Sequence, residues 1–127
     1  MSIKTHLLSA ALIAASALSA CAPHSGRAGQ LQRVQTTLMV ENNNWMDMTV
    51  YVVRDGLRSR VGSVTSFTRS RFVLTPAMIG GVGEIRLLAD PLGSNQQFLS
   101  EPILVNEGQQ VRFRVENNMQ LSSYTVY

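Results

Sequence analysis

Residues 48–61 read "MTVYVVRDGLRSRV" and contain two segments rich in strand-forming residues, joined by Asp55 and Gly56. Valine, threonine and tyrosine favour strands because branched and aromatic side chains pack well on a pleated surface. An Asp-Gly pair favours a two-residue type I′ turn, in which both central residues take positive φ. The stretch therefore predicts a β-hairpin in which Tyr51 faces Arg60.

A second turn at Thr65-Ser66 would extend this hairpin, with Arg60 facing Arg71 in the next strand. In that register one face is apolar and the other carries a tyrosine with four arginines. The apolar side chains are Met48, Val50, Val52, Leu57, Val61, Phe72 and Leu74, with Val50 opposite Val61. The polar face has Tyr51, Arg58, Arg60, Arg69 and Arg71. The sequence thus predicts a three-stranded antiparallel meander.

The remainder of the chain continues as short β-runs separated by turn residues. Further strands are expected at 34–40, 84–90, 98–105, 109–117 and 122–127, with one short helical turn within 75–83. About eight strands in one small domain are typical of two packed antiparallel sheets. We therefore expect residues 33–127 to form an all-β domain, a small β-sandwich of immunoglobulin-like type.

The N-terminal residues 1–20 have the zones of a signal peptide. Lys4 is followed by twelve uncharged residues, 7–18, and then by small side chains. As a helix the uncharged segment would span roughly 18 Å, well short of the ~30 Å hydrocarbon core of a bilayer. It is therefore too short for a transmembrane helix and has the length of a signal-peptide core.

The stretch Leu18-Ser19-Ala20-Cys21 resembles the lipobox of bacterial lipoproteins. The resemblance implies cleavage between Ala20 and Cys21 and a lipid on the Cys21 thiol, which anchors the chain to a membrane of the cell envelope. Ala22, in place of an aspartate, implies the outer membrane facing the periplasm rather than the inner membrane. The alternative is an ordinary secretory signal in which Cys21 is incidental.

Residues 21–32 are rich in Gly, Ala, Ser and Pro and predict a lipidated flexible tether between membrane and domain. The domain itself is similar to a type of small, uncharacterised bacterial lipoprotein with an Asn-rich turn after its first strand and a Gly turn before a late strand. Here those turns are "NNN" at 42–44 and "NEG" at 106–108. That similarity implies no activity.

The inventory of reactive side chains argues against an enzyme. Lys4 is the only lysine, Cys21 the only cysteine, and His24 lies in the tether. A hydrolase triad and a tetrahedral zinc site both need such residues, so we expect no catalytic site, no metal and no cofactor. The remaining option is convergence of strand-end acids, as a carboxylate pair or a calcium site with Asn42 to Asn44. Those acids are Asp47, Asp55, Glu84 and Asp90.

Charge and aromatic residues indicate the candidate surfaces for binding a partner. Loss of Lys4 lowers the formal net charge of +3 to +2, which does not indicate nucleic-acid binding. The face of Tyr51, Arg58, Arg60, Arg69 and Arg71 is either a solvated sheet or a surface for an anionic envelope component or envelope protein. Trp45, in the Asn-rich turn, is expected to be buried, either in the core or as a cap on the end of the sandwich. An exposed Trp45 would instead favour a small-ligand or carbohydrate-binding loop.

The sequence therefore predicts a membrane-anchored envelope lipoprotein that acts as a non-enzymatic interaction or accessory module. Its membrane contact is the lipid on Cys21. The alternative function is a small-ligand or carbohydrate binder using the loops near Trp45.

Overall fold

The computed structural model describes residues 34–80 and 83–127. The signal peptide predicted at 1–20, the tether at 21–32 and the lipid site at Cys21 lie outside the described residues. Within the described part, no helix is long and apolar enough to cross a bilayer.

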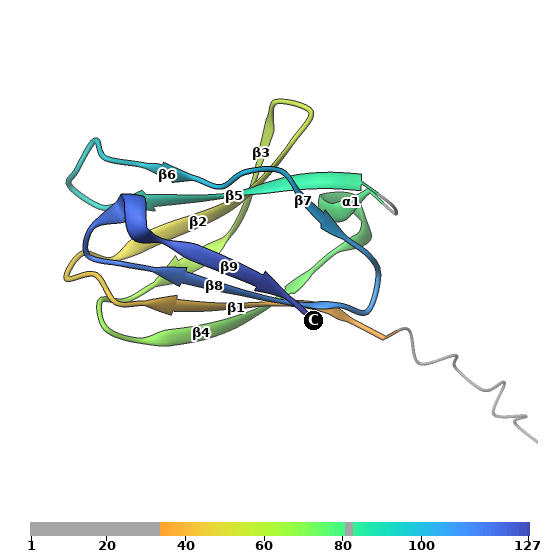
Figure 1. Ribbon diagram of the computed structural model, residues 1–127, viewed down its shortest axis with the longest axis horizontal. Helices are drawn as coiled ribbons and strands as arrows, with labels where there is room; N and C mark the ends of the chain where they lie inside the picture. The colour runs from red at the N-terminus through yellow and green to blue at the C-terminus, as the bar shows by residue number, and fades with distance from the viewer. Residues whose placement is uncertain (1–33, 81–82) are drawn as a thin grey trace, which may run out of the picture.

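The domain is an all-β sandwich of two sheets, as the sequence predicts (Figure 1). Sheet I has the order β4-β1-β8-β9 and sheet II the order β3-β2-β5-β6, with β7 also paired to β5. Sheet I contains β1 (Thr36–Asn42), β4 (Arg69–Leu74), β8 (Gln110–Val115) and β9 (Ser123–Val126). Sheet II contains β2 (Met48–Arg54), β3 (Leu57–Val64), β5 (Gly83–Pro91), β6 (Phe98–Leu99) and β7 (Ile103–Val105). All ladders are antiparallel except that between β1 and β8.

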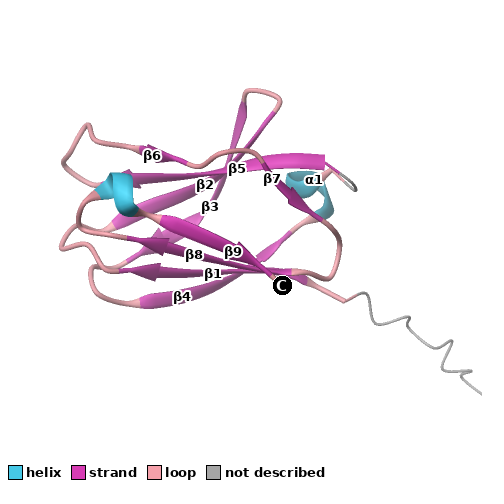
Figure 2. Ribbon diagram, in the orientation of Figure 1, coloured by secondary structure: helices cyan, strands magenta, loops and turns pink. Residues whose placement is uncertain are grey.

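Two short helical segments interrupt the strands (Figure 2). The four-residue α1 (Pro76–Ile79) occupies the stretch where one helical turn is expected, and the 3₁₀ helix η1 (Met119–Leu121) precedes β9. The predicted strand at 98–105 is divided into β6 and β7. Ser100 ends β6, since its hydroxyl accepts from the Leu87 amide and donates to the Glu101 carbonyl. Pro102 has no amide proton to add to a ladder, so pairing resumes only at β7.

The core lies between the sheets because alternate residues of each strand point inward. In β1 and β8 every second residue is buried, and β2 follows the same alternation for most of its length. The largest fully buried side chains are Phe113, Leu38, Met48, Ile79, Ile85 and Leu87. Each such side chain contributes about 1.5–3 kcal/mol through removal of apolar surface from water.

The predicted β2–β3 hairpin is present. Asp55 and Gly56 form its turn with φ of 50° and 78°, and Tyr51 pairs with Arg60 as expected. A bulge between Val50 and Tyr51 then shifts the register, so Val50 lies opposite Gly62 rather than Val61. A bulge adds one residue to one strand and increases its local twist, which a count from the turn does not anticipate.

The predicted pairing of the third strand of the meander is wrong, although the strand itself is present as β4. The chain turns at 65–68, but β4 crosses to the other sheet and pairs with β1, from Thr36 opposite Leu74 to Glu41 opposite Arg69. Phe72 still packs against the core, and a side chain added at Gly62 would meet its ring, so β3 and β4 contact each other across the sandwich. Leu57, expected on the apolar face, is exposed because the tip of the hairpin extends beyond the core.

Candidate binding surfaces

Four connections meet at the end of the sandwich opposite the point where the described chain begins (Figure 1). We call this the loop end. It consists of the β1–β2, β3–β4, β5–β6 and β8–β9 connections, at 43–47, 65–68, 92–97 and 116–122. Because each connection is short and follows a core strand, the sheets fix where all four begin and end.

Two buried asparagines hold the loop end together. The amide nitrogen of Asn42 lies 2.9 Å from the Met46 carbonyl oxygen and 3.2 Å from the carbonyl oxygens of Val64 and Thr65. Its side-chain oxygen accepts from the Asn44 amide at 3.0 Å. Asn42 thereby closes its own turn and joins it to the end of β3.

Asn44 makes the matching connection to the other side of the loop end. Its Nδ2 lies 3.2 Å from the carbonyl oxygens of both Glu116 and Asn117, and its Oδ1 accepts from the Met46 amide at 2.9 Å. Its own carbonyl oxygen accepts from the Phe67 amide at 3.3 Å. The side chain is buried, so these bonds are shielded from competition with water.

Asp47 completes the network. Its carboxylate accepts from the Ser66 amide at 2.9 Å, and its carbonyl oxygen accepts from the Leu92 amide at 2.8 Å. All four connections are thus linked through residues of the Asn-rich turn. The loop end is a braced surface.

Large apolar side chains project from this braced surface. Trp45 is 70% exposed, and the expectation that it is buried is wrong. Asn44 and Met46, on either side, take the inward positions, so the residue between them points outward. Each of the other three connections also exposes one large apolar side chain: Phe67, Leu92 and Leu121. Phe67 has a φ of 54°, an uncommon conformation for a bulky residue.

The predicted arginine surface does not form as one ladder. Tyr51, Arg58 and Arg60 belong to sheet II, whereas Arg69 and Arg71 belong to sheet I. Arg58 and Arg60 are exposed on the β2–β3 hairpin, and Arg60 donates to the Ser63 hydroxyl at 2.8 Å. The opposition of Arg60 and Arg71 that the meander required is absent, because β3 and β4 are not paired.

A different arginine cluster forms on the outer face of sheet I. Arg112 and Arg114 of β8 lie on this face with Arg69 and Arg71 of β4, and Glu41 of β1 lies between the strands. Glu41 is within 3.0 Å of Arg69 and 3.6 Å of Arg114, and Arg114 is also 3.9 Å from Glu116. Arg112 instead lies over the Tyr127 ring, 5.8 Å from its centroid.

Sequence reasoning missed Arg112 and Arg114 as members of this cluster. The signal was available in part, since both alternate with the core residues of β8 and must therefore point outward. Their neighbours depend on the parallel pairing of β8 with β1, which juxtaposes segments about seventy residues apart in the chain. No turn connects those strands directly, so no count from a turn gives their register.

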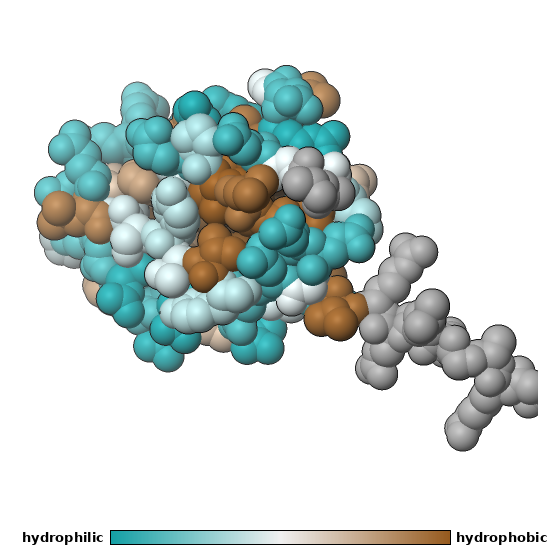
Figure 3. Space-filling view, turned by 45° about the vertical axis from the view of Figure 1, so that its right-hand side comes forward, coloured by the Kyte–Doolittle hydropathy of each residue, from teal (hydrophilic) through white to brown (hydrophobic). Residues whose placement is uncertain are grey.

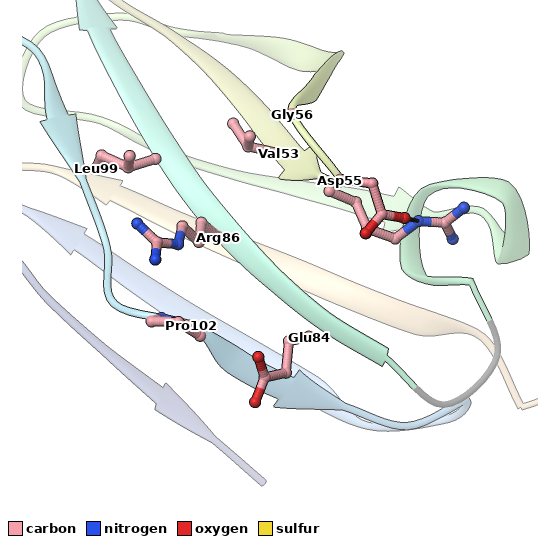
Figure 4. A pocket seen from close by; sticks show the side chains of 8 residues that line it. Val53, Asp55, Gly56, Glu84, Arg86, Leu99 and Pro102 are labelled. Carbon is pink, nitrogen blue, oxygen red and sulfur yellow. Dashed lines mark ion pairs between the residues drawn. The ribbon is translucent and has the colours of Figure 1, made fainter.

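The four acids considered for a carboxylate pair or a calcium site lie in two separate places. Asp55 and Glu84 line a hollow of about 380 Å³ on sheet II, with Arg54, Arg86, Leu99 and other residues around it (Figure 4). Asp55 pairs with Arg54 at 3.3 Å, and Figure 4 shows the Glu84 carboxylate directed away from that pair. Asp47 and Asp90 lie near the loop end. Among the described residues no three His, Cys, Asp or Glu side chains gather as metal ligands would.

No family model and no curated protein matches the sequence. A solved structure titled "NMR structure of the protein from Eubacterium rectale" is similar with a TM-score of 0.46 and 16% sequence identity. The alignment covers 77% of this chain and 91% of that one.

Proposed function

We propose that this chain is a non-enzymatic interaction module, anchored to the bacterial cell envelope by a lipid on Cys21, that binds its partner through the loop end. The observation that carries the proposal is the exposure of Trp45, Phe67, Leu92 and Leu121 on four loops braced by buried asparagines. Single exposed apolar residues are ordinary on a protein surface, but four on one end indicate a contact site.

The physics of binding supports this use of the loop end. A few residues supply most of the energy at protein interfaces, and tryptophan is enriched among them because it buries a large area with few rotatable bonds. A loop that is already fixed loses little conformational entropy when it binds. The hydrogen bonds of Asn42, Asn44 and Asp47 fix the backbone on both sides of Trp45, so the loop that carries the indole needs no further ordering.

A second candidate function uses the same residue. The exposed Trp45 ring lies in the same turn as the partly exposed Asn43, and an aromatic face near a side-chain amide suits the stacking of a sugar. This small-ligand or carbohydrate module differs from the leading proposal in the number of loops that contact the ligand. A sugar uses one ring and its neighbours, whereas a protein partner uses apolar side chains from several loops.

The two functions are separated by capture from envelope extract and by a glycan array. We expect Trp45→Ala to abolish capture of a protein partner, and Phe67→Ser to weaken it at least tenfold, with little dependence on salt. The matched control is Leu104→Ala, an exposed apolar residue on β7, away from the loop end. Capture that survives Trp45→Ala would overturn the proposal. Glycan binding lost with Trp45→Ala but kept with Phe67→Ser would establish the second function instead.

The lipid anchor has its own test. The lipobox pattern at 18–21 supports attachment at Cys21, in the outer membrane facing the periplasm. Cys21→Ser is expected to abolish labelling by a radioactive or clickable fatty acid and to leave uncleaved precursor, because the thiol is the acceptor of the diacylglyceryl group. His24→Ala, three residues further on, should change neither readout. Persistent labelling of the Cys21→Ser variant would contradict the anchor.

A further inference from the structure

The side chains on the outer face of sheet I change from uncharged to charged along the strands, from the start of β1 toward the loop end. Its side chains form three rows across the strands, because residues paired in register share a face. The row nearest the start of β1 is Val73, Thr37, Gln110 and Tyr127. The middle row is Arg71, Met39, Arg112 and Thr125. The row nearest the loop end is Arg69, Glu41, Arg114 and Ser123.

Positive charge without a carboxylate partner is concentrated in the middle row. Glu41 neutralises part of the row at the loop end through its contacts with Arg69 and Arg114. Among the described residues no carboxylate lies within 4.0 Å of Arg71 or Arg112. These two guanidinium groups stand on either side of Met39, two strand spacings or about 10 Å apart at the backbone. They can therefore contact two phosphate groups of an extended anionic surface.

The row beside this charge is apolar at both ends. Val73 and Tyr127 are exposed, and Val34, just before β1, is exposed as well. Figure 3 turns this end of the molecule forward and shows hydrophobic surface next to the point where the grey chain leaves the domain. A tyrosine and aliphatic side chains beside arginines form the amphipathic pattern of an interfacial membrane contact, in which the rings lie at headgroup depth.

The anchor places this face within reach of a membrane. Twelve residues, 22–33, separate Cys21 from Val34, and the thirteen Cα-to-Cα steps between these two residues span at most about 45 Å. A tether this short holds the domain at an effective concentration near millimolar at the surface. A contact that binds only weakly from solution is then sufficient to orient the domain. This step rests on the proposed lipid at Cys21.

We infer that the outer face of sheet I docks on anionic lipid headgroups beside the anchor. Arg71 and Arg112 contact headgroup phosphates, and Val34, Val73 and Tyr127 enter the interface. The end of the sandwich where β1 begins is then the end nearer the bilayer, and the loop end with Trp45 lies at the far end of the same sheets (Figure 1). The arrangement leaves the proposed partner site free while the domain is held at the membrane.

The test uses the mature chain, residues 21–127, with Cys21→Ser so that no lipid contributes. Its core residues all belong to the two described sheets and their connections, and circular dichroism checks that each variant is folded. Co-sedimentation is measured with vesicles of phosphatidylcholine alone and of phosphatidylcholine mixed with phosphatidylglycerol, at low salt. We expect binding only to the anionic vesicles. Arg71→Ser with Arg112→Ser should lower the partition coefficient about 30-fold, since each arginine near an anionic surface contributes about fivefold.

The matched control removes the same charge from the other sheet. Arg58→Ser with Arg60→Ser leaves sheet I intact and should lower the partition coefficient less than threefold. Equal losses in the two double variants, no loss in either, or equal binding to both vesicle types would overturn the docking face. Binding to a soluble polyphosphate that depends on Arg71 and Arg112, without vesicle binding, would also overturn it. Because the protein tested lacks the lipid, these results are independent of Cys21 labelling and of capture through Trp45.

Discussion

Asn44→Ala is expected to lower the free energy of unfolding by about 2–4 kcal/mol, because it leaves several buried polar groups without partners. The Asn44 side chain accepts from the Met46 amide and donates to the carbonyl oxygens of Glu116 and Asn117. The side chain is only 1% exposed, so water reaches these groups poorly in the native loop end. An unsatisfied buried group costs about 1–3 kcal/mol, and local relaxation recovers part of the total.

The measurement is thermal and urea unfolding followed by circular dichroism. A loss of this size lowers Tm by roughly 10–25 °C in a domain of about a hundred residues. The matched control is Asn43→Ala, one residue earlier, whose side chain bonds only the Glu116 carboxylate at 3.2 Å and is partly exposed. That variant should lose less than about 1 kcal/mol. Equal losses at the two positions would contradict the bracing role given to Asn44.

The same variant connects stability to the proposed function. If Asn44 holds the loop end, its removal should expose the amides of 43–47 and 116–122 to hydrogen exchange before the sheets open. Partner capture should then fall even though Trp45 itself is unchanged. A variant that unfolds more easily but keeps full capture would show that Asn44 stabilises the fold without being needed for binding through the loop end.

The sequence was sufficient for the class of fold and for several local features. Alternation in β1, β2 and β8 is strong enough to identify which residues face inward, and Asp55-Gly56 specifies its turn. The helical turn at α1 and the final strand β9 also follow from pattern. These features depend on residues close together in the chain, where propensity and periodicity act directly.

Which strand pairs with which could not be predicted from local pattern, as β4 shows. Its alternating side chains fit equally well beside β3 or beside β1, since both arrangements put Phe72 and Leu74 toward the core. Whether β4 pairs with β3 or with β1 depends on the direction in which the chain leaves the turn at 65–68. Phe67 takes positive φ in this turn, and a positive φ is usually predicted from a glycine or an asparagine, which this position lacks. Arg69 and Arg71 were therefore assigned to the correct side of β4 but to the wrong neighbours, whereas the predicted pairing of Tyr51 with Arg60 is confirmed.

Trp45 was misplaced for a related reason. A tryptophan at the end of a strand is usually mostly buried, and no residue of the turn indicated that the Trp45 side chain would be exposed. In the structure buried polar side chains, Asn42 and Asn44, close this end of the sandwich instead. A sequence shows that asparagine suits a turn, but which backbone groups its amide will satisfy depends on the ends of β3 and β8, which meet the turn only in the folded domain.

Phe113→Ala is expected to have the largest effect, a loss of about 3–5 kcal/mol in the free energy of unfolding. Phe113 is fully buried in the middle of β8, and its ring packs on Phe98 with centroids 5.8 Å apart. Truncation removes apolar contact and leaves a cavity that two rigid sheets collapse around only in part. The lost ring is also the support of β6, which is otherwise held to β5 by the pairs Leu88–Leu99 and Ala89–Phe98 and by two hydrogen bonds between Ser100 and Leu87.

The consequence is a local effect that can be measured beside the global one. Hydrogen exchange at residues 98–100 should accelerate in Phe113→Ala more than exchange at β1 does, because β6 has few other contacts to hold it. The matched control is Phe67→Ala, the same chemical change at an exposed position of the loop end, where the loss should stay below about 1 kcal/mol. If the two substitutions cost the same, Phe113 does not join the sheets. If exchange rises evenly across both sheets, β6 is held by its own pairing rather than by the ring beneath it.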